Sequence, residues 1–180
     1  MAATFDWEAD TGAATGSPAK GTTRTTGMSD NNWKNVDDSS TAYSSSPITA
    51  GNNSFERWMF GKFSGTFNNI LSGLWAHTAT AFGTGLTLKG APAGSSQLTY
   101  TTPSATANSN LTVDMTTAIS IGSGVAVYFG ATGPEASGKA TTMATNPCYT
   151  NYLTSQLQTT SSAAAGDTAT VTLTLQYQEN

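Results

Sequence analysis

Charged side chains are scarce in this chain. Asp, Glu, Lys and Arg make up 10% of its 180 residues, whereas about 25% is usual for a soluble domain. The seven Lys and Arg residues are scattered, and the net charge is −4. Nucleic-acid binding depends on clustered positive charge that releases counterions from the phosphates. We therefore expect no nucleic-acid partner.

Cysteine and histidine occur once each, as Cys148 and His77. A single cysteine excludes an internal disulfide and favours folding in a reducing compartment. A single histidine excludes metal sites built on two histidines and leaves one imidazole for any nucleophile triad. Because no catalytic signature surrounds His77, we interpret it as a structural residue. We predict no catalytic residue, no metal site and no cofactor.

Long apolar runs are missing as well. No window approaches the roughly 18 uninterrupted apolar residues of a membrane-spanning helix, and residues 1–7 lack a basic region followed by an apolar one. A secretory leader has both regions. We expect neither export by the general route nor a span through a membrane.

Hydroxyl side chains take the place of the missing charges. Ser and Thr together supply nearly a third of the residues. Thr is β-branched and packs well on a pleated surface, whereas Lys and Glu, the usual exposed residues of helices, are few. The composition therefore favours β-sheet. Together with the short, regularly spaced strand candidates farther along the chain, it predicts an all-β chain with a single β-sandwich or jelly-roll-like domain.

Residues 1–54 show no sustained apolar period and are rich in Gly, Ser, Thr and Pro. This pattern predicts an extended, mostly irregular N-terminal arm. Large apolar side chains nevertheless occur along it, which disordered linkers usually lack. The sequence leaves open whether they pack on their own domain or on a neighbouring subunit. Five of them are our candidate interface residues: Phe5, Trp7, Met28, Trp33 and Tyr43.

The predicted β-sandwich domain covers residues 55–180. Its start favours a hairpin of two strands, at residues 58–60 and 67–76, with a turn at Gly65. A helix is the alternative, but the glycines of this stretch would each cost about 0.5–1 kcal/mol inside one. Further short strands are expected at residues 86–88, 98–102, 111–115, 124–131 and 149–157, the last with a helix as its alternative.

The clearest strand pattern lies at residues 169–177, where apolar residues alternate with Thr and Gln. Such alternation is typical of a strand with one buried face and one solvated face. Since the pattern ends three residues before Asn180, we expect this strand to close or edge a sheet. The apolar face consists of Ala169, Val171, Leu173, Leu175 and Tyr177.

Residues 133–140 match the phosphate-binding loop pattern as far as Lys139, and an apolar stretch precedes them. That loop requires a hydroxyl residue after the lysine, to bind Mg²⁺, and a helix that binds phosphate at its N-terminus. Here Ala140 follows the lysine, and Pro147 leaves no room for the helix. We interpret the segment as a polar loop, and nucleotide hydrolysis is the one concrete enzymatic alternative.

Asp6, Glu8 and Asp10 are spaced two residues apart, as acidic ligands are in some calcium loops. The glycine and the distal glutamate of the twelve-residue calcium loop are missing. Two carboxylates of this chain could also serve glycoside cleavage, but most of its acids lie in the arm or in turns. We therefore interpret these acids as solvated loop residues.

Several patches resemble the structural proteins of tailed-bacteriophage virions. They cover residues 55–58, 61–70 and 100–106 and the alternating tail that ends at Glu179, and the resemblance spans about the last two-thirds of the chain. It implies a small, non-enzymatic β protein, made in the host bacterial cytoplasm and then built into the virion in many copies. Capsid decoration and cement proteins are of this kind.

The expected partners are the major capsid protein or other virion proteins. Symmetric self-association is also expected, with a trimer as the first expectation. Two alternatives stay open. One is a neck, collar or tail protein, and the other is a host-receptor or glycan-binding module in which exposed Trp and Tyr residues stack on sugars.

Overall fold

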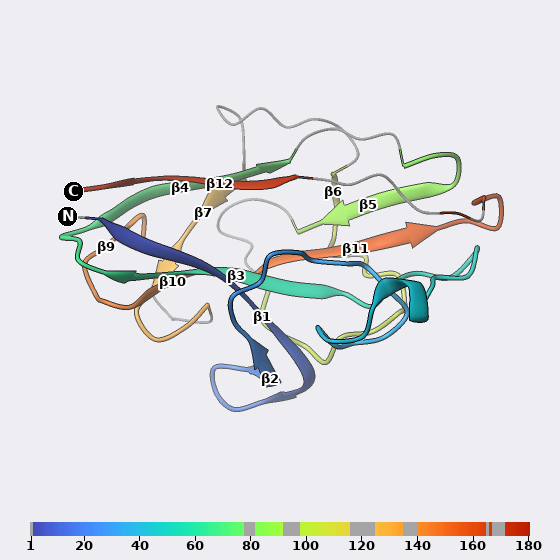
Figure 1. The fold of residues 1–180 in the computed structure, drawn as a ribbon, viewed down its shortest axis with the longest axis horizontal. Helices are drawn as coiled ribbons and strands as arrows, with labels where there is room; N and C mark the ends of the chain where they lie inside the picture. Colours follow the sequence, from blue (N-terminus) through green and yellow to red (C-terminus); the bar gives the residue numbers. More distant parts are fainter. Residues whose placement is uncertain are drawn as a thin grey trace.

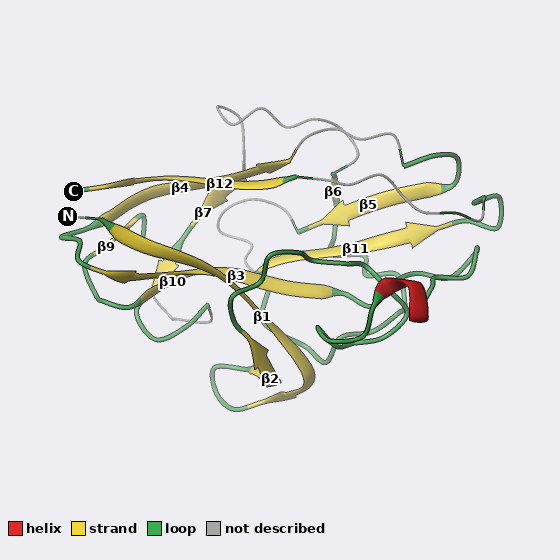
Figure 2. Ribbon diagram, in the orientation of Figure 1, coloured by secondary structure: helices red, strands yellow, loops and turns green. Residues whose placement is uncertain are grey.

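The computed structural model describes residues 2–77, 82–91, 98–115, 125–134, 140–164, 166 and 172–180. Within these ranges the fold is all-β, as the composition predicts. Antiparallel strands form two sheets, here called sheet A and sheet B, in a sandwich-like domain (Figures 1 and 2). The described residues contain no α-helix and one 3-10 turn, η1 (Tyr43–Ser45).

Sheet A is the larger of the two. Its strands follow the order β2 (Lys20–Thr25), β1 (Ala3–Thr15), β3 (Arg57–Gly65), β11 (Leu153–Thr159), β5 (Leu86–Gly90) and β6 (Val113–Asp114). Two short strands extend it, since β10 (Cys148–Thr150) pairs with β3 and with β8 (Phe129–Gly130). Sheet B consists of β12 (Leu173–Glu179), β4 (Ile70–His77) and β7 (Val125–Val127), with β9 (Thr142–Met143) paired to β4.

The N-terminal residues belong to sheet A. Strand β1 pairs with β3 from Ala3 opposite Gly65 to Asp10 opposite Trp58, and β2 folds back on β1. The prediction of an irregular arm is therefore wrong for residues 3–15 and 20–25. Residues 26–54 are irregular apart from η1, as predicted, and the irregular segment continues to residue 56. Strand β1 was not recognised in the sequence because the residues on its outer face are acids, and acids usually indicate exposed loops.

Strands form on both sides of Gly65, so the strand interpretation is confirmed over the helical one. The predicted hairpin is wrong, because β3 lies in sheet A and β4 in sheet B. Both edges of β3 are occupied, by β1 on one side and by β10 and β11 on the other. Gly65 has a φ of +93°, which favours glycine. The chain crosses to the second sheet after it.

The other strand predictions have mixed outcomes. The segments at residues 86–88 and 149–157 form strands, while residues 98–102 are irregular. Within this irregular segment Tyr100 is buried, and its hydroxyl donates to the Gly12 carbonyl over 2.8 Å. Of residues 111–115 only Val113–Asp114 form a strand. The described part of the predicted strand at 124–131 is divided at Tyr128, with Val125–Val127 in sheet B and Phe129–Gly130 in sheet A.

Strand β12 shows the predicted alternation in its described part. Leu173, Leu175 and Tyr177 pack against the core, and β12 lies at the edge of sheet B beside β4. Residues 169–171 of the predicted strand lie outside the described residues. The two chain ends lie side by side (Figure 1), since the Ala3 amide donates to Glu179 Oε2 over 2.8 Å.

Sheet A is covered on both faces. Its inner face meets sheet B, where Phe63 and Tyr177 pack with ring centroids 4.5 Å apart. Farther along the same face the cover is the irregular segment 26–56, which contributes Met28, Trp33 and Ile48 to the core. The outer face carries a second buried cluster, formed by Trp58, Phe60, Tyr100 and Tyr152. Two-sided burial explains why Trp58, Met59 and Phe60 are apolar in succession.

Candidate functional site

Four of the five predicted interface residues pack on the chain's own domain. Phe5, Trp7, Met28 and Trp33 are partly buried against the core between the sheets. Tyr43 differs, since half of its surface is exposed. It is the one exposed large hydrophobic residue among those that the structure describes. The five residues therefore separate into a docked group and a single projecting ring.

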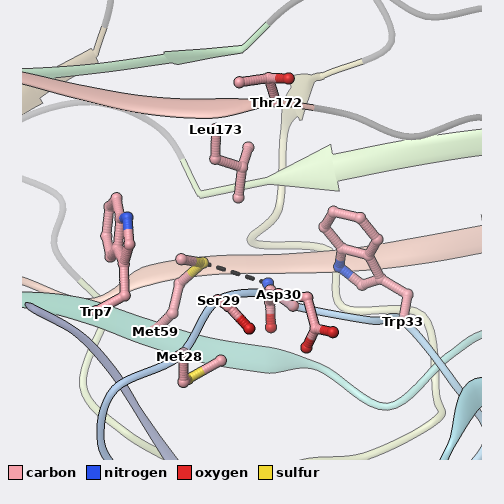
Figure 3. A pocket seen from close by; sticks show the side chains of 9 residues that line it. Trp7, Met28, Ser29, Asp30, Trp33, Met59, Thr172 and Leu173 are labelled. Carbon is pink, nitrogen blue, oxygen red and sulfur yellow. Dashed lines mark hydrogen bonds between the residues drawn. The ribbon is translucent and has the colours of Figure 1, made fainter.

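Three of the docked residues meet at one pocket, which we call the aromatic groove. It has a volume of about 290 Å³ and lies where sheet B and the segment 26–56 adjoin on the inner face of sheet A. Trp7 and Trp33 stand at its opposite ends with the two methionines between them (Figure 3). Its lining consists of Trp7, Met28, Ser29, Asp30, Asn31, Trp33, Met59, Thr172 and Leu173.

Both indole rings of the groove are fixed by neighbours. Trp7 packs edge-on against Phe5, with ring centroids 5.0 Å apart and an interplanar angle of 85°. Its carbonyl accepts a hydrogen bond from the Met28 amide over 3.1 Å, which holds the following loop against β1. The Trp33 indole N–H donates to Ser155 Oγ over 3.1 Å. The groove is thus largely formed before any ligand arrives.

Arg57 lies in β3, in contact with the groove residue Asn31, and is 2% exposed. Its guanidinium donates to Asn31 Oδ1 over 2.9 Å, to the Asp38 carbonyl over 2.9 Å and to Ser39 Oγ over 3.3 Å. In the described part of the chain no carboxylate lies within 4.0 Å of it. Burial lowers the pKa of Arg57, and the more distant charges of Asp37 and Asp38 oppose this effect.

Arg57 also sets the orientation of Asn31. A guanidinium only donates hydrogen bonds, so the oxygen of the Asn31 amide must face it. The amide nitrogen then lies at the groove wall, where Nδ2 is 3.2 Å from Met59 Sδ (dashed line in Figure 3). Asn31 thereby presents N–H donors to the groove. Its neighbour Asp30 is exposed and presents acceptors only.

A smaller polar pocket of about 180 Å³ adjoins the aromatic groove and shares Met28, Ser29 and Asp30 with it. The buried Lys34 lines this pocket and donates to Asp38 Oδ1 over 2.9 Å and to the Thr41 carbonyl. Hydrogen bonds from Thr41 and Lys34 hold the pKa of Asp38 well below its usual range. The charges of Lys34 and Asp38 therefore serve to brace this loop.

The interpretation of the acidic spacing as solvated loop residues is wrong for Glu8 and Asp10, which are each 1% exposed. Arg24 donates to both carboxylate oxygens of Asp10 over 2.8 and 3.0 Å, and the Tyr152 hydroxyl donates to the same group over 2.5 Å. Lys62 lies 3.4 Å from Glu8. The sequence could not show this network, because its cations come from distant segments.

The carboxylates of this acidic network are paired with cations. Among the residues that the structure describes, no group of three or more His, Cys, Asp and Glu residues could hold a metal ion. Glu8 and Asp10 instead face cations of the neighbouring strands β2 and β3. The network therefore joins three strands of sheet A on its outer face.

The remaining candidates for chemistry are incompletely described or buried. His77 is the last residue of β4, and neither its side chain nor residues 135–139 of the polar loop are among the described parts. Cys148 is fully buried, and this burial raises the pKa of its thiol to about 11. A thiol in this environment is protonated at neutral pH and poorly reactive.

Fold and site together define an all-β, sandwich-like domain with a preformed aromatic groove. No protein-family model matches the chain, and neither a curated protein nor a solved structure matches it. In the described ranges, no helix is long and apolar enough to cross a membrane.

The groove residues that sequence reasoning missed are Ser29, Asp30, Asn31, Met59 and Thr172. Arg57, which orients Asn31 from the adjoining pocket, was missed as well. The pair at 30–31 follows Met28 and precedes Trp33 in the chain, and polar residues between large apolar ones in a loop are a usable signal. Arg57 gave no such signal, because its position beside Asn31 depends on the pairing of β3 with β1 and β11.

Proposed function

We propose that this chain is a non-enzymatic structural protein of a tailed-phage particle, bound to the capsid shell as a decoration or cement protein. The resemblance of residues 55–58, 61–70 and 100–106 to virion proteins supports this function. The structural observation that carries it is the projection of Tyr43 from a braced loop. Its neighbours in the predicted interface set are docked on the domain, so Tyr43 is the residue left to contact a partner.

The loop that carries Tyr43 is held in place at several points. Its ends are joined by the bond from the Asn35 amide to the Ser46 carbonyl over 2.9 Å. Within it, Asp38 accepts from the Ser40 and Thr41 amides over 2.9 and 2.7 Å. Arg57 and Lys34 reach it from below. A preorganised loop loses little conformational entropy when a partner binds.

An exposed aromatic ring on such a loop is a suitable anchor for a neighbouring subunit. Tyrosine is enriched among the residues that dominate interface energetics, since its ring is large and has few rotatable bonds. Full burial of a side chain of this size contributes about 1.5–3 kcal/mol. With one such contact per copy, a shell decorated by many copies would be stabilised additively. The major capsid protein is the proposed partner, and a trimer is the proposed assembly.

The experiment uses particles of a phage whose genome encodes this chain. Particles grown without the chain are mixed with purified wild-type protein, and the bound copies are counted by sedimentation and mass spectrometry. We expect saturable binding and greater resistance of the shell to heat. The Tyr43→Ala protein should bind at least about tenfold more weakly, while the neighbouring Ser44→Ala protein should bind like the wild type.

Two results would contradict the proposal. One is the absence of the chain from purified wild-type particles. The other is that the Tyr43→Ala protein binds the particles as tightly as the wild type. The copy number distinguishes the structural alternatives, because a neck, collar or tail protein is present in few copies, whereas a head decoration protein is present in many.

A further inference from the structure

The aromatic groove holds polar groups of complementary kind. Asp30 is exposed at the groove, where its carboxylate presents acceptors, and its charge interacts with that of Arg57. Asn31 is oriented by Arg57 so that its amide nitrogen lies at the groove wall. A group that only accepts hydrogen bonds and a donor therefore line the same groove at adjacent positions of the chain, together with the indoles of Trp7 and Trp33.

We propose that the aromatic groove binds a neutral saccharide chain. Asp30 and Asn31 engage neighbouring ring hydroxyls, and Trp7 and Trp33 contact the apolar C–H faces of the sugar rings. This activity goes beyond the proposed structural function, since it belongs to a different surface from the loop that carries Tyr43.

Sugar hydroxyls fit this pair because each hydroxyl both donates and accepts hydrogen bonds. The Asp30 carboxylate accepts a hydrogen bond from one sugar hydroxyl, and the Asn31 amide donates a hydrogen bond to the oxygen of the neighbouring hydroxyl. Ser29 and Thr172 line the same groove and add two further hydroxyl groups. Aromatic side chains with a few placed polar groups are the usual composition of small-ligand sites.

Other ligand classes fit less well. An anion would meet the exposed carboxylate of Asp30. The cation Arg57 lines the adjoining polar pocket, and its hydrogen bonds are directed to Asn31, Asp38 and Ser39. A cation would meet the N–H groups of Asn31. A purely apolar peptide would cover Asp30 and Asn31 without satisfying them, which is costly for polar groups.

The shape of the groove favours a chain over an enclosed monosaccharide. Its volume of about 290 Å³ is just below the roughly 300–1,000 Å³ typical of ligand pockets. Trp7 and Trp33 stand apart at its two ends, with Met28 and Met59 between them (Figure 3). Ser29 and Asp30 are exposed, so the groove opens to solvent along one side. Successive sugar rings along a chain match this elongated form.

The test uses the isolated full chain and four neutral hexasaccharides as probes: maltohexaose, cellohexaose, mannohexaose and chitohexaose. Binding is followed by tryptophan fluorescence and by calorimetry. We expect at least one probe to bind in the micromolar-to-millimolar range. Trp33→Ala should abolish this binding. The Tyr43→Ala protein is the matched aromatic control, and it should bind like the wild type because Tyr43 lies outside the groove lining.

Asn31→Asp separates binding from folding. The new carboxylate has the shape of the amide and pairs directly with the buried Arg57, so the variant should unfold at the same or a higher temperature. It removes the N–H donors from the groove, so its affinity should fall about tenfold or more. Asp30→Asn should weaken binding to a similar degree, because an amide replaces one acceptor oxygen with a donor.

Failure of all four probes to bind the wild type would overturn the proposal. Unchanged affinity in Asn31→Asp and Trp33→Ala would do the same, because binding would then lie elsewhere. These outcomes are independent of the particle experiment, since the isolated chain can bind sugar without joining a shell and can join a shell without binding sugar.

Discussion

Arg24 and Asp10 face each other in register across the β1–β2 pair, and their side chains form a two-point ion pair. The Asp10 carboxylate also accepts from the Tyr152 hydroxyl. Arg24 in turn lies over the Phe60 ring, with Cζ 4.7 Å from the centroid. One carboxylate thus joins an edge strand of sheet A to the aromatic cluster on its outer face.

Replacement of Asp10 by Ala should destabilise the fold strongly. It leaves the Arg24 charge and the Tyr152 hydroxyl without their common acceptor. Removal of one partner from a fully buried pair costs about 3–5 kcal/mol, and the 32% exposure of the Arg24 side chain limits the loss to the lower end of that range. We expect the free energy of unfolding, measured in urea, to fall by about 3 kcal/mol. Thr23→Ala, at an exposed position of β2, should change it by less than about 0.5 kcal/mol. Equal effects of the two substitutions would refute a structural role for the ion pair.

Asp38 should make the loop that carries Tyr43 sensitive to acid. Its folded-state pKa lies below the ordinary value of 3.8, so its contribution to stability is present in full above that pH. The contribution is lost as the pH falls toward the lower pKa of the folded state. Asp38→Asn should therefore cost about 1 kcal/mol near pH 6 and less near pH 2.5.

Urea unfolding of both proteins at these two pH values measures the difference. Burial raises the pKa of Asp37 and of Glu56, and these groups act with the opposite sign. Glu56 is present in both proteins and cancels. The charge of Asp38 adds to the raised pKa of Asp37, so Asp38→Asn also relieves Asp37, and the measured difference contains both effects. Ser44→Ala serves as the control without a change in charge. A loss that is the same at pH 6 and pH 2.5 would show that the Asp38 carboxylate does not act through its ionised form.

Gly61 is required by its contact with Phe5. A Cβ atom at position 61 would lie 2.5 Å from Phe5 Cε2 and 3.2 Å from Thr150 Cγ2. Overpacking of this kind costs about 1–3 kcal/mol, so Gly61→Ala should lower the unfolding free energy by that amount. Leucine is shorter than phenylalanine, so Phe5→Leu should relieve part of the loss. A double-mutant cycle without coupling between the two sites would argue against the contact.

Cys148 should resist alkylation in the folded protein. Burial raises the pKa of its thiol from 9.0 to about 11, a shift of about two units that alone reduces the thiolate fraction at pH 8 about a hundredfold. Iodoacetamide should therefore label the native protein far more slowly than the protein in urea. A Ser44→Cys protein carries an exposed second thiol as an internal control, and mass spectrometry should find one rapid and one slow label. Two rapid labels would show that Cys148 is accessible.

The class of the fold follows from local features of the sequence. Thr-rich alternation at residues 172–177 favours strands wherever it occurs, because β-branched side chains suit a pleated surface. The glycines near Gly65 likewise exclude a helix there without any knowledge of partners. These features depend on neighbours along the chain, so they were predictable.

The pairing of strands was not predictable in the same way. Residues 57–65 and 70–77 are adjacent in sequence but lie in different sheets, because β1 and β11 occupy the edges of β3. Residues 98–102 have the apolar content of a strand, yet they form an irregular cover in which Tyr100 packs against Trp58. Which segment pairs with a given strand edge depends on competition among several segments of the chain. The sequence of one segment does not show the outcome of that competition.

The candidate site was likewise predictable from the sequence only in part. The sequence by itself identified Trp7, Met28 and Trp33 as large apolar residues in a polar segment, since disordered linkers rarely contain them. Only the tertiary structure brought them to one groove and placed Arg57 against Asn31. It also converted Glu8 and Asp10 from apparent loop acids into buried partners of distant cations. The physical reason is that burial and charge pairing depend on which strands become neighbours in space.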